Sequence, residues 1–137
     1  MPDVLELEIA TPERQLVREE ATEVQLPAKN GYLGILPGHA ALLSMMGTGF
    51  LTYTVGGRKR TLSVQGGFVE ISDNHVRVLA NVAERAEEID VARAKEELRR
   101  ANEQVNNLIN PSLGVDPAVA LDALAWAQAR VDAVEQK

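Results

Sequence analysis

The sequence of 137 residues contains no cysteine, so a disulfide framework, a thiolate nucleophile and a cysteine-ligated metal are all excluded. Histidine occurs only at His39 and His75, and neither lies in a spacing typical of a metal site. The serines lack the context of a nucleophile elbow, and the strand-like stretches offer no acid–base pair. The sequence therefore predicts a protein with no catalytic residues and no metal site.

Long apolar runs and an excess of positive charge are also missing. No apolar run approaches the roughly 18 residues that span a bilayer, and the N-terminus lacks the basic and apolar regions of a signal peptide. The 14 Lys and Arg residues are outnumbered by 20 Asp and Glu, which gives a net charge of −6. Because affinity for a phosphate backbone comes from clustered cations, we expect no nucleic-acid partner and no direct membrane insertion.

Residues 1 to about 86 show the period of two that is typical of β-strands. Apolar residues alternate with glutamates over residues 5–9. Residues 50–65 and 68–80 each contain two such runs around a Gly-Gly or an Asp-Asn turn, which predicts two hairpins. Nine of the ten glycines lie in this part of the chain. The pattern predicts an antiparallel β-sandwich or flattened barrel.

From residue 87 onward the apolar period becomes that of a helix. Between Ala94 and Leu108, apolar residues recur at spacings of four and three. Asp90 is a candidate N-cap, and Asn110-Pro111 predicts the end of a helix of about 20 residues. A second run with the same spacing follows Asp116-Pro117, a typical cap followed by proline at the first helical position.

The two predicted helices are joined by a short loop at residues 111–115, so we expect them to pack antiparallel. Ten alanines lie between residues 92 and 133. An alanine-rich seam buries little apolar area, so we expect the hairpin to dock weakly and to be able to move. The predicted fold is α+β and mainly β: a sandwich domain at residues 1–86, then an antiparallel two-helix hairpin at residues 87–137.

One irregular segment mixes glycines, a proline and a histidine with apolar residues. It reads Gly31-Tyr32-Leu33-Gly34-Ile35-Leu36-Pro37-Gly38-His39-Ala40-Ala41-Leu42-Leu43. This segment resembles the Gly-x-Leu-Gly-Ile-Leu-Pro-Gly-His-Ala-Pro-Leu-Leu signature of the epsilon subunits of F-type ATP synthases. Gly66-Gly67-Phe68 is similar to a later motif of that family, and residues 83–94 resemble the stretch that leads into its first C-terminal helix. Tyr32 and Ala41 depart from the family pattern.

The resemblance implies a sandwich followed by a helical hairpin in a subunit that is not itself catalytic. Such a subunit binds the gamma subunit and the c-ring at the foot of the central stalk. Its hairpin regulates ATP hydrolysis when it extends toward the alpha and beta catalytic subunits. The implied location is peripheral, on the cytoplasmic face of the bacterial inner membrane. The rotor contact is expected in one segment, at Tyr32, Leu33, Leu36, Pro37, His39 and Leu42.

In some bacterial relatives ATP binds at the folded hairpin through an Ile-Asp-x-x-Arg-Ala motif. The sequence matches that motif from Ile89 to Ala94. The implied ATP-binding residues are Glu84, Ile89, Asp90, Arg93, Ala94, Arg100 and Arg130. The alternative is that Asp90 is only a helix cap and Arg93 only a surface residue. Trp126 stands where binders have a second arginine, so we expect no required cofactor and at most a weak regulatory ATP.

Two other classes of function compete with the rotor subunit. A free-standing nucleotide sensor is expected to be monomeric and to have no affinity for a gamma subunit. A small hydrolase on a β-sandwich is excluded because no catalytic constellation is present. A rotor subunit is expected to carry an incompletely covered apolar patch for gamma.

Overall fold

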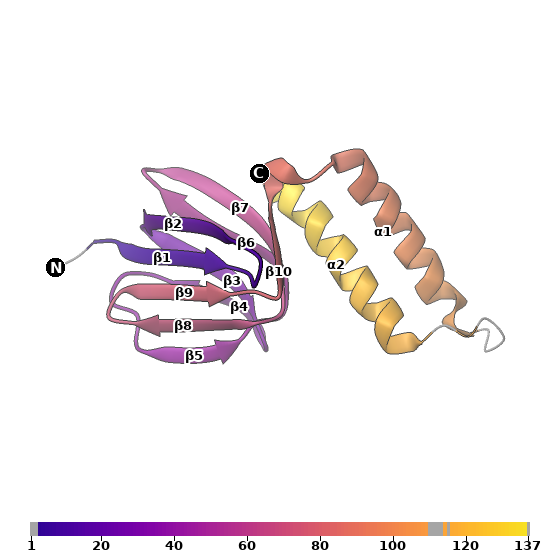
Figure 1. Cartoon of the computed structure of the whole chain (residues 1–137), viewed down its shortest axis with the longest axis horizontal. Helices are drawn as coiled ribbons and strands as arrows, with labels where there is room; N and C mark the ends of the chain where they lie inside the picture. Colours follow the sequence, from indigo (N-terminus) through magenta and orange to yellow (C-terminus); the bar gives the residue numbers. More distant parts are fainter. Residues whose placement is uncertain (1–2, 110–113, 115, 137) are drawn as a thin grey trace.

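The computed structural model describes residues 3–109, 114 and 116–136. Ten strands precede two α-helices in this described part of the chain (Figure 1). The strands are β1 (Leu5–Ala10), β2 (Gln15–Ala21), β3 (Glu23–Ala28), β4 (Gly31–Ile35), β5 (Leu42–Met45), β6 (Thr48–Val55), β7 (Arg58–Gln65), β8 (Phe68–Ser72), β9 (His75–Leu79) and β10 (Val82–Arg85). The helices are α1 (Val91–Asn106) and α2 (Pro117–Gln136), with short 3-10 turns at η1 (Ala86–Glu88) and η2 (Asn107–Ile109).

The strands form two five-stranded sheets that pack face to face as a sandwich. Sheet A has the order β2-β1-β9-β8-β5, and sheet B has the order β10-β7-β6-β3-β4. Every neighbouring pair is antiparallel except β1 and β9, which run parallel. Alternation places Leu5, Leu7 and Ile9 of β1 in the core, where they are at most 1% exposed. The predicted fold class is confirmed, with one parallel pair that local pattern did not indicate.

Both predicted hairpins are present. Gly56 and Gly57, which join β6 to β7, have φ values of 57° and 78°. Asp73 and Asn74, which join β8 to β9, have φ values of 48° and 62°. Two consecutive residues with positive φ give the type I′ geometry, whose twist matches that of the flanking strands. Asp and Asn tolerate this region better than other residues with a side chain.

Both predicted helix starts are confirmed by their caps. The backbone N–H of Arg93 donates to Oδ1 of Asp90 at 3.1 Å, and that of Ala118 donates to Oδ1 of Asp116 at 2.9 Å. Helix α1 has 16 residues before it tightens into η2, so it is shorter than the predicted 20. The predicted stop at Asn110-Pro111 and most of the loop to residue 115 lie outside the described residues.

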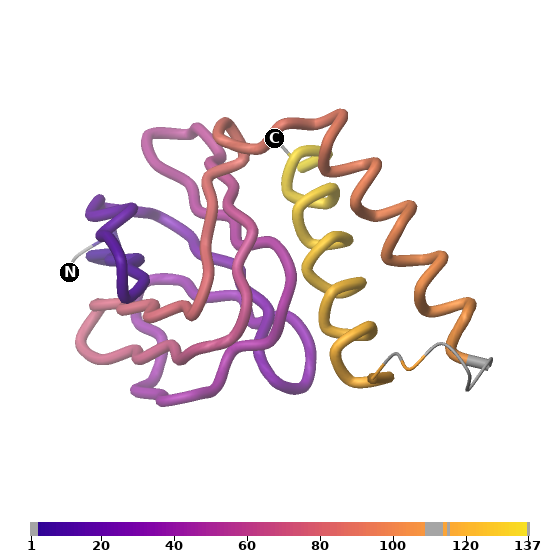
Figure 2. The backbone as a smooth tube through the Cα atoms, turned by 45° about the vertical axis from the view of Figure 1, so that its right-hand side comes forward, coloured from indigo at the N-terminus to yellow at the C-terminus, as the bar shows by residue number. Residues whose placement is uncertain are grey.

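Helix α2 lies between the sandwich and α1. Figures 1 and 2 show it against sheet B, with α1 on its far side. Its neighbours in the sheet are β6 and β7. Ile89, Ala94, Val131 and Ala133 form a small second core, which is separate from the core between the sheets. The hairpin is therefore folded against the sandwich in this structure.

Candidate functional site

Arg130 on α2 connects three parts of the fold. Its side chain is only 13% exposed. Its Nη1 donates to Oε2 of Glu97 on α1 at 2.5 Å, and its Nε lies 2.9 Å from Oε1 of Glu84 on β10. The Nε contact is an ion pair without hydrogen-bond geometry, since the N–H is not aimed at the oxygen. One guanidinium thus ties α2 to the sandwich and to α1.

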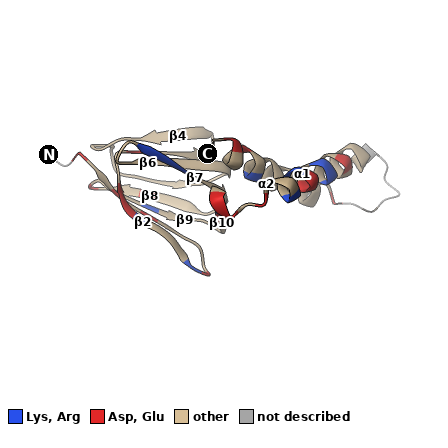
Figure 3. Ribbon diagram, turned by 90° about the horizontal axis from the view of Figure 1, so that it is seen from above, with Lys and Arg blue, Asp and Glu red and all other residues tan. Residues whose placement is uncertain are grey.

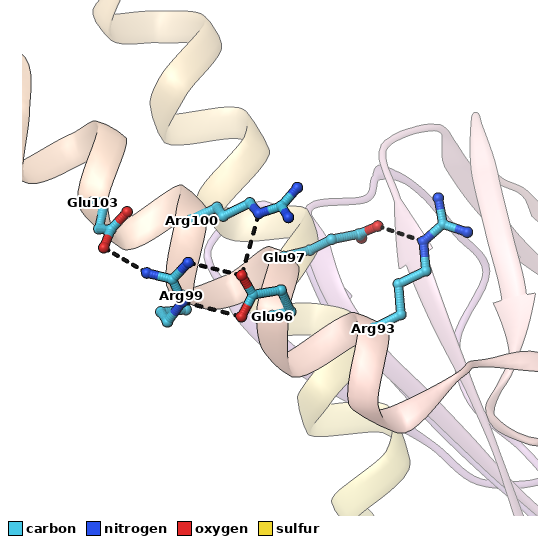
Figure 4. A network of polar contacts seen from close by, with 6 residues as sticks. All are labelled: Arg93, Glu96, Glu97, Arg99, Arg100 and Glu103. Carbon is cyan, nitrogen blue, oxygen red and sulfur yellow. Dashed lines mark hydrogen bonds and ion pairs between the residues drawn. The ribbon is translucent and has the colours of Figure 1, made fainter.

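Glu97 is shared between two arginines. Its Oε1 accepts from Nε of Arg93 at 3.0 Å, while its Oε2 accepts from Arg130. Figure 4 shows Arg93 and Glu97 one turn apart along α1, with their side chains directed toward each other. The spacing of four residues places them on one flank of the helix. The carboxylate therefore lies between the two guanidinium groups.

We call the contacts among Glu84, Arg93, Glu97 and Arg130 the junction. A second group of ion pairs lies along α1 and involves none of these residues. Glu96 accepts from Arg99 and Arg100, and Arg99 also donates to Glu103 (Figure 4). Hydrogen bonds from Arg99, ahead of those from Arg100, lower the pKa of Glu96 to about 2. Figure 3 shows both signs of charge along α1. These pairs are exposed and connect residues of one helix, so they support α1 itself rather than its docking.

The structure brings together some of the predicted ATP-binding residues. Glu84, Arg93 and Arg130 converge on one junction, and Asp90 caps α1 beside them. Two others are core residues of the hairpin, namely Ile89 and Ala94.

The remaining predicted residue, Arg100, is turned toward Glu96. Sequence reasoning did not include Glu97, although its spacing of four from Arg93 is the signal that pairs them.

A small cavity lies on the opposite flank of α1 from Arg93. It has a volume of about 140 Å³ and is lined by Val91, Ala94, Lys95, Val131, Val134 and Glu135. At 100° per residue, Val91 and Lys95 point away from the flank that carries Arg93 and Glu97. On the arginine flank the guanidinium groups meet carboxylates of the chain itself.

The predicted rotor-contact segment runs from β4 of sheet B to β5 of sheet A. Tyr32 packs its ring on Phe50 with centroids 4.9 Å apart, and its hydroxyl accepts the backbone N–H of Phe50 at 3.1 Å. Burial raises the pKa of the Tyr32 hydroxyl. Leu33 is half-buried against the sandwich core. Tyr32 and Leu33 therefore already make contacts within the chain.

The other segment residues differ in their exposure. Leu36 and Leu42 are exposed, whereas Pro37 and His39 are half-buried. The Nδ1 of His39 lies 2.7 Å from the carbonyl oxygen of Ala40, so its ring is held against the backbone of its own loop. Leu36 directly follows β4, and Leu42 is the first residue of β5.

Four large apolar side chains on sheet A are exposed but were not among the predicted contact residues. They are at least 50% exposed and come from β5, β8 and β9: Leu43, Met45, Phe68 and Leu79. Met45 pairs in register with Phe68, and Phe68 with Leu79, so three of them form a row across the strands. Leu43 lies two residues before Met45 on the same face of β5. We call these four residues the apolar patch. In β8 and β9 the signal was an apolar residue next to a buried valine, namely Phe68 beside Val69 and Leu79 beside Val78.

The other half of the outer face of sheet A is charged. His75 lies 2.6 Å from Glu6, and Arg77 donates to Glu8 at 3.2 Å. No group of three His, Asp or Glu residues within 3–109 and 116–136 is arranged to hold a metal ion. None of the described helices is both long and apolar enough to cross a membrane.

The comparisons with known proteins agree with this architecture. The family model described as ATP synthase, Delta/Epsilon chain, beta-sandwich domain matches residues 4–86, and the long alpha-helix domain of the same chain matches residues 87–135. The sequence is 61% identical to the ATP synthase epsilon chain of Solibacter usitatus over 137 residues, with all of both chains covered. It is 40% identical to that of Desulfitobacterium hafniense over 133 residues, which covers 97% of this chain and 98% of the relative.

Solved structures show the same fold at lower identity. A chain of the Euglena gracilis mitochondrial ATP synthase, OSCP/F1/c-ring, aligns with a TM-score of 0.78 and 21% identity over all of this chain and 84% of that one. A chain of the Tetrahymena thermophila mitochondrial ATP synthase central stalk and c-ring aligns with a TM-score of 0.58 and 15% identity, covering 96% and 94%. On the sequence matches, the chain belongs to the ATP synthase delta/epsilon chain family.

Proposed function

We propose that the chain is a non-catalytic rotor subunit of a bacterial F-type ATP synthase, where it couples proton translocation to ATP synthesis. Its partners are the gamma subunit and the c-ring, and its place is the cytoplasmic face of the inner membrane. The bacterial relatives named ATP synthase epsilon chain support this assignment. Two structural neighbours are chains of mitochondrial ATP synthase complexes described as OSCP/F1/c-ring and as central stalk with c-ring.

The apolar patch is the observation that carries the proposal. Isolated soluble domains rarely leave a row of large apolar side chains uncovered, and such rows mark contacts with other proteins. The row of Met45, Phe68 and Leu79 gives the gamma subunit an apolar centre to bury, and the charged half of the sheet gives a polar rim. A free-standing nucleotide sensor has no need of such a patch.

Copurification with the gamma subunit of the same organism tests the proposal. Phe68→Glu places a charge in the centre of the patch, so we expect loss of the complex on a gel-filtration column. Leu121→Glu on α2 is the matched control, because Leu121 is also about half exposed but lies on the hairpin. Failure of the unaltered chain to bind gamma would contradict the rotor assignment and favour the free-standing sensor.

We also infer that the hairpin regulates ATP hydrolysis by leaving the sandwich and extending toward the alpha and beta subunits. The support is the composition of its docking surface. Thr61 and Ser63 of β7 are buried with hydroxyls that have no hydrogen-bond partner among the described residues. Buried unpartnered hydroxyls weaken a contact. A docking energy of a few kcal/mol lets partners shift the equilibrium.

ATP is proposed as a weak ligand of the folded hairpin, at the junction of Glu84, Arg93 and Arg130. The two arginines supply donors that suit phosphate groups. Calorimetry with the full chain, together with the emission of Trp126, measures the affinity. Arg93→Ala is expected to abolish the heat signal, and Arg99→Ala, which removes an exposed arginine elsewhere on α1, is expected to leave it unchanged.

A further inference from the structure

Glu97 forms ion pairs with both arginines of the proposed ATP site, Arg93 and Arg130. Its oxygens lie 3.0 Å from Nε of Arg93 and 2.5 Å from Nη1 of Arg130. The two arginines come from different helices. Among the carboxylates of the described residues, only Glu97 contacts both of them. Their positions match what a terminal phosphate group needs, since carboxylate and phosphate oxygens accept from the same guanidinium donors.

The junction is already neutralised before any ligand arrives. Arg130 is paired with Glu84 as well as with Glu97, while Asp90 lies at the N-cap of α1, two turns before Glu97. Two guanidinium groups therefore already contact two carboxylates at the junction. A nucleoside triphosphate entering this junction brings several further negative charges, and like charges in a partly buried site repel strongly.

We propose that Glu97 sets the nucleotide affinity of the folded hairpin by occupying the place of a phosphate group. The proposal rests on the proposed ATP site and concerns the regulation of that site. A nucleotide binds there by displacing the Glu97 carboxylate from Arg93 and Arg130. The side chain is 37% exposed, so it has room to turn toward solvent when it is displaced.

The competing role for Glu97 is to hold α1 on α2. A purely structural Glu97 predicts that its removal loosens the hairpin and leaves nucleotide affinity the same or lower. If Glu97 instead sets the affinity, its removal is expected to raise the affinity for the nucleotide. The direction of the change therefore separates the two roles.

The test is calorimetric titration of the full chain with ATP and with AMP, using Glu97→Gln. This change keeps the shape and removes the charge. The matched control is Glu103→Gln on the same helix, because Glu103 pairs at 2.5 Å with Arg99, away from the junction. We expect Glu97→Gln to tighten ATP binding at least tenfold, with a smaller gain for AMP, while Glu103→Gln behaves as the unaltered chain.

Three other outcomes overturn the inference, and one further outcome supports it. Equal or weaker ATP binding by Glu97→Gln, with binding retained by the unaltered chain, contradicts the role of Glu97 and leaves the ATP site in place. An equal gain for AMP and ATP contradicts a role at the phosphates. Absence of binding by every variant removes both the inference and the ATP proposal, but not the gamma-binding proposal. Binding by Glu97→Gln alone supports the inference.

Discussion

The sandwich and the helical hairpin are stabilised by different kinds of buried side chain. The sandwich core consists of large aliphatic side chains that are almost completely buried, such as Leu51, Leu62 and Ile71. The hairpin meets sheet B and packs internally through alanines, the small core around Ile89 and Val131, two unpartnered hydroxyls and the paired Arg130. Burial of one large aliphatic side chain stabilises by about 1.5–3 kcal/mol, whereas an unpartnered buried hydroxyl costs about 1–3 kcal/mol. We therefore expect the sandwich to be the more stable region and the hairpin to be able to detach from it.

Truncation of a core residue gives the largest expected effect. Leu51→Ala, at a position with no exposure, is expected to lower the free energy of unfolding by about 2–5 kcal/mol. Val131→Ala in the small hairpin core is expected to cost less than about 2 kcal/mol and to act on the hairpin alone. Urea unfolding followed by circular dichroism measures both. An equal loss of unfolding free energy at the two positions would contradict the expected difference in stability between the sandwich and the hairpin.

Removal of the Arg130 guanidinium is expected to release the hairpin. Arg130→Met leaves Glu84 and Glu97 without their shared cation, which we expect to weaken docking by about 2 kcal/mol, less than for a fully buried pair because both carboxylates are partly exposed. Amide hydrogen exchange in α2 is expected to accelerate while exchange in β6 stays unchanged. Arg99→Met is the control. If it accelerated amide exchange in α2 as much as Arg130→Met does, the contacts of Arg130 would not be what holds the hairpin.

Removal of a buried hydroxyl is expected to do the opposite. Thr61→Val keeps the branched shape but deletes the unpartnered hydroxyl beneath the hairpin, so docking is expected to strengthen by about 1 kcal/mol. Slower amide exchange in α2 is the readout. Thr54→Val, on the neighbouring strand and only half-buried, is expected to change little. Faster exchange in Thr61→Val would show that the hydroxyl stabilises docking.

The smallest effect concerns η1, which joins the two regions. Hydrogen bonds from Arg14 lower the pKa of Glu88. A carboxylate with a depressed folded pKa contributes stability above its unfolded pKa and loses it as the pH falls through the folded pKa. We therefore expect a small loss of stability at acid pH. Nuclear magnetic resonance titration measures the midpoint, and Arg14→Gln is expected to raise it toward the ordinary glutamate value. An unchanged midpoint would contradict the pairing.

The sequence predicted the features that depend on neighbouring residues. The turn pairs at 56–57 and 73–74, the caps Asp90 and Asp116 and the two helical periods are each visible within a few residues. The parallel pairing of β1 with β9 joins segments about 70 residues apart, and no local pattern reports it.

The candidate site could be predicted only in part for the same reason. The family motif supplied Asp90 and Arg93, but the bridge from Glu97 to Arg130 spans 33 residues and forms only when the hairpin folds. The apolar patch was visible as apolar residues on both faces of β8 and β9, yet alternation draws attention to the buried face.

Native-state hydrogen exchange of the full chain tests most directly whether the hairpin detaches from an intact sandwich. We expect amides of α1 and α2 to exchange through a shared opening whose free energy is several kcal/mol below that which protects the strands of the sandwich. Protection of the helices and the central strands at one common free energy would contradict it, because the hairpin would then leave the sandwich only when the whole chain unfolds.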